Sequence, residues 1–553
     1  MRRIYVLSLI FALFIGAILV KLFYIQIIAS ALFTPNNYLR TSRIEPSRGN
    51  IYDRNKEPLV INQAYYTLFG EPKNITDESK LIKQVDEAIH IGEATLEARF
   101  KKDKKWIPIA YNLTEDQKMQ IEKEKIPGIG FDEYKKRYYP EASIAAQLLG
   151  FVGKDNEGDG VGYFGIEGFY HKDLEGLPGI LKTERDIIGR PIVIGTQNRL
   201  KGENGRDLVL TIDKSSQMIV KKALLAAMEK YRAKQGCVTV ANPQTGEILA
   251  LSCLPDFDPA TYADFTQVEY RNPVISDTFE PGSIFKPLVV AAALEEHAIK
   301  ADDTYDEKGP VKMGQYYIRT WNDEYNGTIS ISRILQTSSN VGMVHIGEKL
   351  GNDALLSYIE KYGFGKETGI DLQGETTSKL KPKKLWYPID FATATFGQGI
   401  AVTQIQMIAA FSSIINGGWM VKPFVVKELT SESGESKVIK PKKLERVISE
   451  KTSKEIIQML VETVKHGEAK WDIPRGYVIG GKTGTAQIAV SGKYDATKTN
   501  ASFIGFAPAQ DPKFIMLVTL RQPETSQWAS ETAAPLFFDI AKKLFVEYNI
   551  APN

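Results

Sequence analysis

The chain has 553 residues, of which 43% are hydrophobic and 25% are charged. This length allows two or three domains, each large enough to bury a core. The formal net charge is +2, so the composition indicates no polyanion partner and no nucleic-acid binding. Two cysteines and five histidines in the whole chain argue against a zinc site.

The N-terminus is the most apolar part of the chain. Two arginines precede an apolar run over residues 4–28, which is interrupted by Lys21, Tyr24 and Gln26. Its length suits one membrane-spanning helix, and the arginines favour a cytoplasmic N-terminus with the rest of the chain outside. A cleaved signal peptide is the alternative, because residues 29–31 resemble a cleavage site. The length of the run favours an uncleaved anchor. In both interpretations, most of the chain lies outside the cytoplasm.

In residues 31–205, catalytic residue types do not occur at a spacing that would indicate an active site. The Lys/Glu-rich stretches over 97–125, within a charged region at 71–135, predict helices with solvated faces. Dense glycine over 150–205 favours turns, hairpins and linker. We interpret 31–205 as an extended mixed pedestal domain.

From residue 206 onward, strand-type runs lie near both ends of the segment and helical patterns lie between them. This order predicts one antiparallel sheet that is faced by helices. The whole chain is therefore expected to be multidomain, with α/β and α+β parts. The expected elements are a strand at 207–213, a helix at 217–232, a hairpin at 237–253, helices over most of 283–470, strands at 477–481, 502–506 and 514–519, and a helix at 533–548.

The two cysteines lie on the two arms of the predicted hairpin. Cys237 and Cys253 flank a turn at residues 242–247, so their sulfurs could be neighbours across the strands. An exported location permits a disulfide. Cross-strand geometry is often unsuitable, however, and the strand register is unknown. The sequence leaves the disulfide open.

A serine and a lysine one turn apart form the first candidate catalytic motif. Pro281-Gly282 breaks the chain, and the apolar run 288–294 predicts a buried helix with Ser283 at its N-terminus. Lys286 then lies on the same face, within reach of the serine hydroxyl. A Ser–Lys pair is an alternative to Ser–His for making a nucleophile. The same spacing at 378–381 has no apolar helix behind it, and we interpret that copy as a solvated loop.

Two further motifs follow in the chain. Ser338-Ser339-Asn340 comes after a predicted helix, and residues 482–485 (Lys-Thr-Gly-Thr) lie on a predicted strand. Each motif alone is compatible with a helix cap, a turn or a strand end. The three motifs in this order, however, are the signature of penicillin-binding proteins and serine β-lactamases.

Each residue type suits a step of acyl transfer. Lys286 can act as a base only when it is neutral, and burial together with a second cation such as Lys482 would favour that form. Ser338 can pass a proton to a leaving amine, and Asn340 can hold a substrate peptide bond. The remaining expected roles are carboxylate binding by Lys482, Thr483 and Thr485, close backbone approach at Gly484, and an oxyanion hole from the N–H groups of Ser283 and Thr485.

The whole chain resembles the class B penicillin-binding proteins, which are membrane-anchored D,D-transpeptidases of bacterial peptidoglycan. Lys56 departs from the family pattern, where we would expect Gly, but it affects only a turn. The segments that carry the resemblance beyond the three motifs are 48–54, 137–140 and 165–168 for the pedestal, and 396–399 and 480–487 for the transpeptidase domain.

The resemblance implies a penicillin-binding protein/β-lactamase-like fold, with a stub and anchor at 1–30, a pedestal at 31–205 and a transpeptidase domain at 206–553. Ser283 would attack the penultimate D-Ala of a stem peptide, release the terminal D-Ala and pass the acyl group to an amine. β-Lactams would acylate the same serine. The resemblance implies no metal or organic cofactor, and it implies a polytopic glycosyltransferase of the shape, elongation, division and sporulation group as partner.

Three other functions stay open. A D,D-carboxypeptidase or a β-lactamase would use water as the acceptor, and a β-lactam sensor or scaffold would lack turnover. The long pedestal argues against a simple hydrolase. The intact set of catalytic residue types argues against a non-catalytic scaffold.

Overall fold

The computed structural model describes residues 2–29, 39–100, 104–141, 144–184, 197–467, 473–490 and 493–552. The chain divides into two compact units. The smaller unit comprises Met1–Arg48 and Glu175–Gly205, and the larger comprises Gly49–Leu174 and Arg206–Asn553.

The smaller unit begins with a long apolar helix. Helix α1 (Arg2–Phe23) continues as the π-helical turn η1 (Tyr24–Ile28). The 25-residue span Ile4–Ile28 contains an 18-residue window with a mean hydropathy of 2.7, and none of that window is buried. The helix is long and apolar enough to cross a membrane, as the sequence predicted. Residues 30 and 31, which belong to the alternative cleavage site, lie outside the described residues.

The same unit contains a three-stranded antiparallel sheet in the order β1–β8–β9. Strands β8 and β9 pair antiparallel, which agrees with a hairpin expected in the glycine-dense stretch 150–205. Residues 185–196 of that stretch lie outside the described part. The strands are β1 (Leu39–Ile44), β8 (Gly179–Glu184) and β9 (Gln197–Leu200).

In the larger unit, the first segment contributes four strands to a seven-stranded sheet and has a small core of its own. The long strand β3 pairs with β2, β4 and β5, and three helices pack into the same core. The predicted helices are present, but β4 crosses the stretch where helix faces were expected, because Ile107, Ile109 and Leu113 point into this core. The elements are β2 (Ile51–Tyr52), β3 (Pro58–Gly70), α2 (Glu78–Ile89), α3 (Glu93–Arg99), β4 (Ile107–Leu113), α4 (Glu115–Glu122) and β5 (Ile129–Tyr138).

Buried polar contacts tie this segment to the rest of the larger unit. Arg137 on β5 forms an ion pair of 2.7 Å with Glu167, and the two side chains are 6% and 0% exposed. Tyr170 donates to Asp371, whose carboxylate also accepts the N–H groups of Val425 and Val426. Burial raises the pKa of Asp371, and these hydrogen bonds oppose that rise. The segment also contains α5 (Ala146–Leu149), β6 (Phe151–Lys154), β7 (Gly160–Tyr163), α6 (Gly165–Phe169) and α7 (His171–Glu175).

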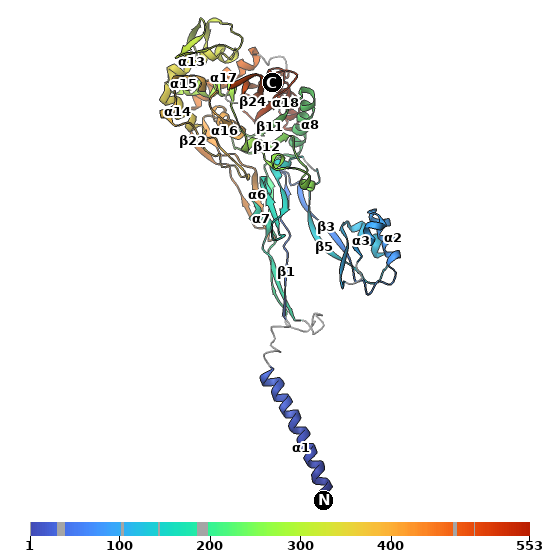
Figure 1. Cartoon of the computed structure of the whole chain (residues 1–553). Helices are drawn as coiled ribbons and strands as arrows, with labels where there is room; N and C mark the ends of the chain where they lie inside the picture. The colour runs from blue at the N-terminus through green and yellow to red at the C-terminus, as the bar shows by residue number, and fades with distance from the viewer. Residues whose placement is uncertain are drawn as a thin grey trace. The chain divides into compact units, whose positions relative to one another are not determined.

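The predicted antiparallel sheet has five strands in the order β12–β11–β25–β24–β23. Helices α8 and α18 cover one face, and α10 (Pro273–Ser276) and α16 (Gln404–Ile415) contact the other. Helices α8, α16 and α18 are labelled in Figure 1. Alternate residues of β25 enter two different cores: Met516 and Val518 face α8 and α18, whereas Ile515 and Leu517 face the opposite helices. The elements are β10 (Asp207–Leu210), α8 (Lys214–Tyr231), β11 (Gln235–Ala241), β12 (Ile248–Leu254), β23 (Gly480–Val490), β24 (Lys493–Ala507), β25 (Phe514–Arg521) and α18 (Ala533–Glu547).

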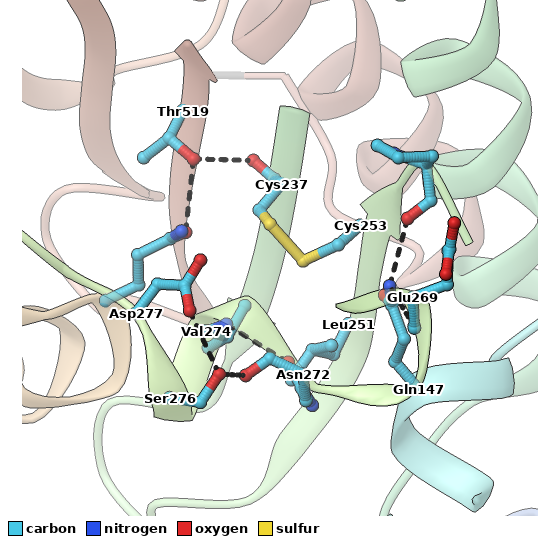
Figure 2. Close-up of a disulfide and its surroundings, with 12 residues drawn as sticks. Gln147, Cys237, Leu251, Cys253, Glu269, Asn272, Val274, Ser276, Asp277 and Thr519 are labelled. Atoms are coloured by element: carbon cyan, nitrogen blue, oxygen red, sulfur yellow. Dashed lines mark hydrogen bonds between the residues drawn. A yellow bond between two sulfur atoms is a disulfide. The ribbon is translucent and has the colours of Figure 1, made fainter. Parts of the chain in front are cut away.

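The hairpin of β11 and β12 contains a disulfide. Cys237 and Cys253 are directly opposite in the strand register, with 4.1 Å between their Cα atoms, and both are buried. Figure 2 shows the bond near Thr519 of β25 and the residues of α10 (Pro273–Ser276). The predicted hairpin is confirmed, and the pairing that the sequence left open is a disulfide.

Residues 283–470 contain the predicted helices, but ten short strands lie in or beside them. Each strand has only two to five residues, so none carries a clear alternation of apolar and polar residues. The expectation of a mainly helical segment was therefore incomplete. The elements are β13 (Thr278–Phe279), α11 (Lys286–Glu295), β14 (Thr304–Glu307), β15 (Val311–Met313), β16 (Tyr316–Ile318), β17 (Gly327–Ser330), α12 (Ile331–Gln336), α13 (Asn340–Leu350), α14 (Asn352–Lys361), α15 (Pro388–Ala394), β18 (Val402–Thr403), α16 (Gln404–Ile415), β19 (Trp419–Val421), β20 (Val426–Thr430), β21 (Ser436–Val438), β22 (Lys443–Arg446) and α17 (Glu450–His466).

Candidate active site

Ser283 lies in a tight turn at the start of a buried helix. The 3-10 turn η5 (Gly282–Phe285) leads directly into α11, so the serine is at the helix N-terminus, as predicted. Gly282 and Gly397 both have positive φ, +58° and +77°, and the Gly282 N–H donates to the Gly397 carbonyl at 3.0 Å. A Cβ on Gly397 would collide with the backbone of Gly282. The two glycines therefore let the segments meet and fix the position of Ser283.

Lys286 connects the first motif to the second. Its side chain is 0% exposed. Its ammonium donates to the Ser338 carbonyl at 2.6 Å, to the Asn340 Oδ1 at 2.9 Å and to the Ser338 hydroxyl at 3.3 Å. The Ser338 hydroxyl donates in turn to the Ser283 Oγ at 2.9 Å. A continuous path of hydrogen bonds thus runs from Ser283 through Ser338 to Lys286.

The backbone of Ser338 is held in an uncommon conformation. Its φ is +54°, in the left-handed region that few residues other than glycine adopt. Glu307, which is 1% exposed, accepts hydrogen bonds from the next residue, Ser339, and from the backbone and side chain of Asn326. The Ser339 hydroxyl also caps α13 by accepting from the Gly342 N–H at 2.8 Å. These contacts keep the Ser338 carbonyl and hydroxyl aimed at Lys286.

The third motif lies on the edge strand of the five-stranded sheet. Lys482 is directly opposite Ile504, whose side chain packs on the side of the sheet that faces α11, so Lys482 points to the same side. Lys482 is 2% exposed, and its ammonium donates to the carbonyl and hydroxyl of Thr483 at 3.0 and 3.2 Å. The Thr485 hydroxyl accepts from the Ala529 N–H at 3.1 Å.

Gly484 is needed for packing within the protein. A Cβ there would lie 2.9 Å from a methyl group of Ile284 and 2.8 Å from the Ser502 hydroxyl. The missing side chain therefore lets β23 approach η5, which carries Ser283. Close approach of a substrate at Gly484 stays a prediction.

The three motifs border one small cleft of about 80 Å³. Ser283, Ser338, Asn340, Thr483 and Thr485 all line it. Lys286 and Lys482 are buried beneath these residues and reach the cleft through their hydrogen-bond partners. Asn340 is engaged at both ends, since its Nδ2 also donates to the Arg319 carbonyl at 3.2 Å.

Several residues of the site were missed by the sequence analysis. The cleft is also lined by Trp321, Phe396, Gln398 and Trp528. Phe396 and Gln398 belong to a segment that carried the family resemblance, so the sequence marked their place but not their role. The two tryptophans come from loops far apart in the chain, and no motif marked them.

Glu280 forms hydrogen bonds that hold the segment before Ser283 in place. Its carboxylate accepts from the Tyr494 hydroxyl at 3.0 Å and from the Gly399 N–H at 3.1 Å. Burial raises the pKa of Glu280, and the two hydrogen bonds oppose that rise. Burial and the nearby Glu280 also raise the pKa of the Tyr494 hydroxyl. Among the residues that the structure describes, no group of three His, Cys, Asp or Glu side chains could hold a metal ion.

Two family models match the chain. The penicillin binding protein transpeptidase domain matches residues 236–542, and the penicillin-binding protein dimerisation domain matches residues 43–210. Together they cover both the segment that forms the cleft and the segment around β3.

Relatives align over nearly the whole length. Stage V sporulation protein D of Bacillus subtilis (strain 168) is 36% identical, over 99% of this chain and 86% of that protein. The peptidoglycan D,D-transpeptidase FtsI of Escherichia coli (strain K12) is 29% identical, over 98% of this chain and 92% of that protein.

Solved structures share the fold. Penicillin Binding Protein 2X from Streptococcus thermophilus has a TM-score of 0.79 at 24% identity, covering 93% of this chain and 80% of that chain. A peptidoglycan synthetase from Bifidobacterium adolescentis has a TM-score of 0.75 at 26% identity, covering 93% of this chain and 98% of that chain.

Proposed function

Because this chain belongs to the class B penicillin-binding proteins, we propose that it is a peptidoglycan D,D-transpeptidase that cross-links stem peptides through an acyl-enzyme on Ser283. The observation that carries this mechanism is the path of hydrogen bonds from Ser283 through Ser338 to Lys286. A serine hydroxyl needs such a neighbouring base before it can attack a carbonyl.

Acylation follows from these contacts. The Ser283 Oγ bonds to the carbonyl carbon of the penultimate D-Ala, and the C–N bond to the terminal D-Ala breaks. Lys286, in its neutral form, takes the serine proton, and the Ser338 hydroxyl relays this proton from Lys286 to the leaving amine, so that Lys286 and Ser338 end in the states in which they began. In the second half, an acceptor amine attacks the ester, and the proton returns by the same groups to the Ser283 Oγ.

The cleft also offers groups for the substrate. The hydroxyls of Thr483 and Thr485, with the charge of Lys482 behind them, would bind the terminal carboxylate. The N–H groups of Ser283 and Thr485 would stabilise the developing oxyanion. Asn340 would hold the stem peptide through the second N–H of its Nδ2, since the amide has two donors and one already binds the Arg319 carbonyl. β-Lactams would acylate Ser283 in the place of the stem peptide.

We also propose that residues 1–30 anchor the chain with its N-terminus in the cytoplasm, and that 31–205 and 206–553 form the pedestal and the transpeptidase domain outside. A polytopic glycosyltransferase of the shape, elongation, division and sporulation group would bind the anchor and pedestal. Protease added to the outside of spheroplasts should digest the chain beyond the anchor. Protection of the whole chain from this protease would contradict the orientation.

The reaction can be tested with the full-length protein in detergent. A donor peptide that ends in D-Ala-D-Ala and a peptide amine are supplied, and mass spectrometry follows free D-Ala and the new amide. Ser283→Ala should abolish both products, while Ser378→Ala, in the solvated copy of the motif, should retain both. Cross-linking by Ser283→Ala would refute the mechanism, and a free acid as the sole product would indicate a carboxypeptidase.

A further inference from the structure

Two tryptophans meet over the cleft that contains Ser283. Trp321 lies in the loop after β16, and Trp528 lies in the loop between β25 and α18. Their rings pack edge to face, with 5.0 Å between centroids and 63° between planes. Both side chains line the cleft together with the Ser283 hydroxyl. The two indoles therefore form an apolar cover that neither loop could make alone.

The loop that carries Trp321 is fastened to the active site. The Arg319 carbonyl accepts a hydrogen bond from the Asn340 amide at 3.2 Å. Within the loop, Arg319 forms two hydrogen bonds of 3.0 Å with Asp323, and the Thr320 hydroxyl donates to the Glu324 carbonyl. Hydrogen bonds within the loop and to Asn340 therefore hold the Trp321 indole in place.

The loop that carries Trp528 is fastened from the other side. The next residue, Ala529, donates its N–H to the Thr485 hydroxyl at 3.1 Å. The Trp528 carbonyl accepts from the Thr532 hydroxyl at 2.8 Å, and the carbonyl of Gln527 accepts from the Thr499 hydroxyl at 3.0 Å. Each indole is therefore positioned by a residue of the candidate site.

The cleft between the indoles and Ser283 is small, about 80 Å³. An ester on Ser283 has two fates in such a cleft. An amine displaces the serine oxygen and forms an amide, whereas water displaces it and forms a free acid. In both cases the C–O bond to Ser283 breaks and the serine oxygen regains a proton, so access to the ester decides the product.

We propose that Trp321 and Trp528 determine the acceptor, by keeping water from the acyl-enzyme until a peptide amine binds. This inference rests on the proposed acyl-enzyme. Trp321 is 52% exposed, so an arriving acceptor peptide meets the outer part of its ring. A bound peptide buries apolar area against this ring and so supplies free energy that a water molecule cannot. The pair thus directs the reaction to transfer and away from hydrolysis.

The test measures the ratio of hydrolysed to amine-linked product with the full-length protein. Trp321→Ala, Trp528→Ala and the double variant should each raise this ratio by about tenfold or more, which corresponds to about 1.4 kcal/mol of transition-state free energy. The double variant should raise the ratio only slightly more than either single variant does, because each single change already breaks the contact between the two rings. The half-life of the penicillin adduct on Ser283 should shorten in parallel.

Matched variants distinguish a role of the tryptophans in shielding the cleft from an effect on folding. Trp528→Phe should keep the ratio near that of the unchanged protein, because Phe retains an apolar ring. Trp386→Ala removes a tryptophan that contacts Phe391 outside the cleft, and it should leave the ratio unchanged. If the Ala variants fold poorly, Trp528→Leu makes the same test, with a raised ratio expected.

Two outcomes would overturn the inference. One is an unchanged ratio in tryptophan variants that still form the Ser283 adduct in full. The other is an equal rise in Trp386→Ala. Failure of the unchanged protein to acylate Ser283 at all would instead refute the proposed function.

Discussion

Replacing Lys286 by Arg tests the base role most sharply. Arginine keeps a positive charge and can donate to Ser338 and Asn340, but it cannot serve as a neutral base. General-base catalysis typically contributes about 10²–10⁴-fold, or about 2.7–5.5 kcal/mol of transition-state free energy. We expect the second-order rate of acylation by a fluorescent penicillin to fall by a factor in this range.

A second variant shows whether the loss is chemical or structural. Lys286→Met has a similar length but no donor, so it leaves the Ser338 carbonyl and the Asn340 Oδ1 without the ammonium that now binds both. The Ser338 carbonyl is the buried acceptor of the two, so the free energy of unfolding should fall by about 1–3 kcal/mol. Chemical denaturation measures this fall, and the rate of acylation should drop as in the Arg variant.

The chain offers a matched control. Lys381 has the same spacing from Ser378 that Lys286 has from Ser283, and it forms an exposed ion pair of 2.9 Å with Asp390. Lys381→Arg should acylate at the rate of the unchanged protein. A folded Lys286→Arg variant that acylates at that same rate would remove Lys286 from the base role.

Three further predictions concern stability. Opening the disulfide by replacing Cys237 and Cys253 with Ala should lower the free energy of unfolding by about 3 kcal/mol, because the bond closes a loop with a sequence separation of 16; an unchanged denaturation midpoint would contradict this. Glu167→Ala should cost about 3–5 kcal/mol in the same assay, because it leaves the buried Arg137 charge without its partner, and a loss below about 1 kcal/mol would show that water reaches this pair. Burial raises the folded-state pKa of Glu280, so the stability that it contributes is present below its unfolded pKa and is lost as the pH rises through the folded pKa. Glu280→Gln lacks this loss, so the melting temperature of the variant should rise relative to that of the unchanged protein as the pH increases above the unfolded Glu pKa of about 4.3. A constant difference would contradict this expectation.

Local patterns predicted the elements that hold the motifs. Pro281-Gly282 before an apolar run placed Ser283 at a helix start, and the structure has η5 and α11 there. The alternation around residues 482–485 predicted a strand, and the structure has β23. Both signals come from neighbours in the sequence, which is why they could be read without coordinates.

Features that depend on distant contacts could not be predicted. Trp321 and Trp528 meet because two loops are fastened to Asn340 and Thr485, and no local pattern encodes that. The buried carboxylate of Glu307 supports Ser338 from a strand of four residues, which is too short to show a period. The disulfide required the register of β11 against β12, which only the assembled sheet fixes.

Peptide mapping of the penicillin-treated protein by mass spectrometry tests the central claim most directly. The account predicts one covalent adduct, on the peptide that contains Ser283, and no adduct in the Ser283→Ala variant. An adduct on Ser338, on Ser378 or elsewhere, or a folded protein that takes up no penicillin, would contradict it.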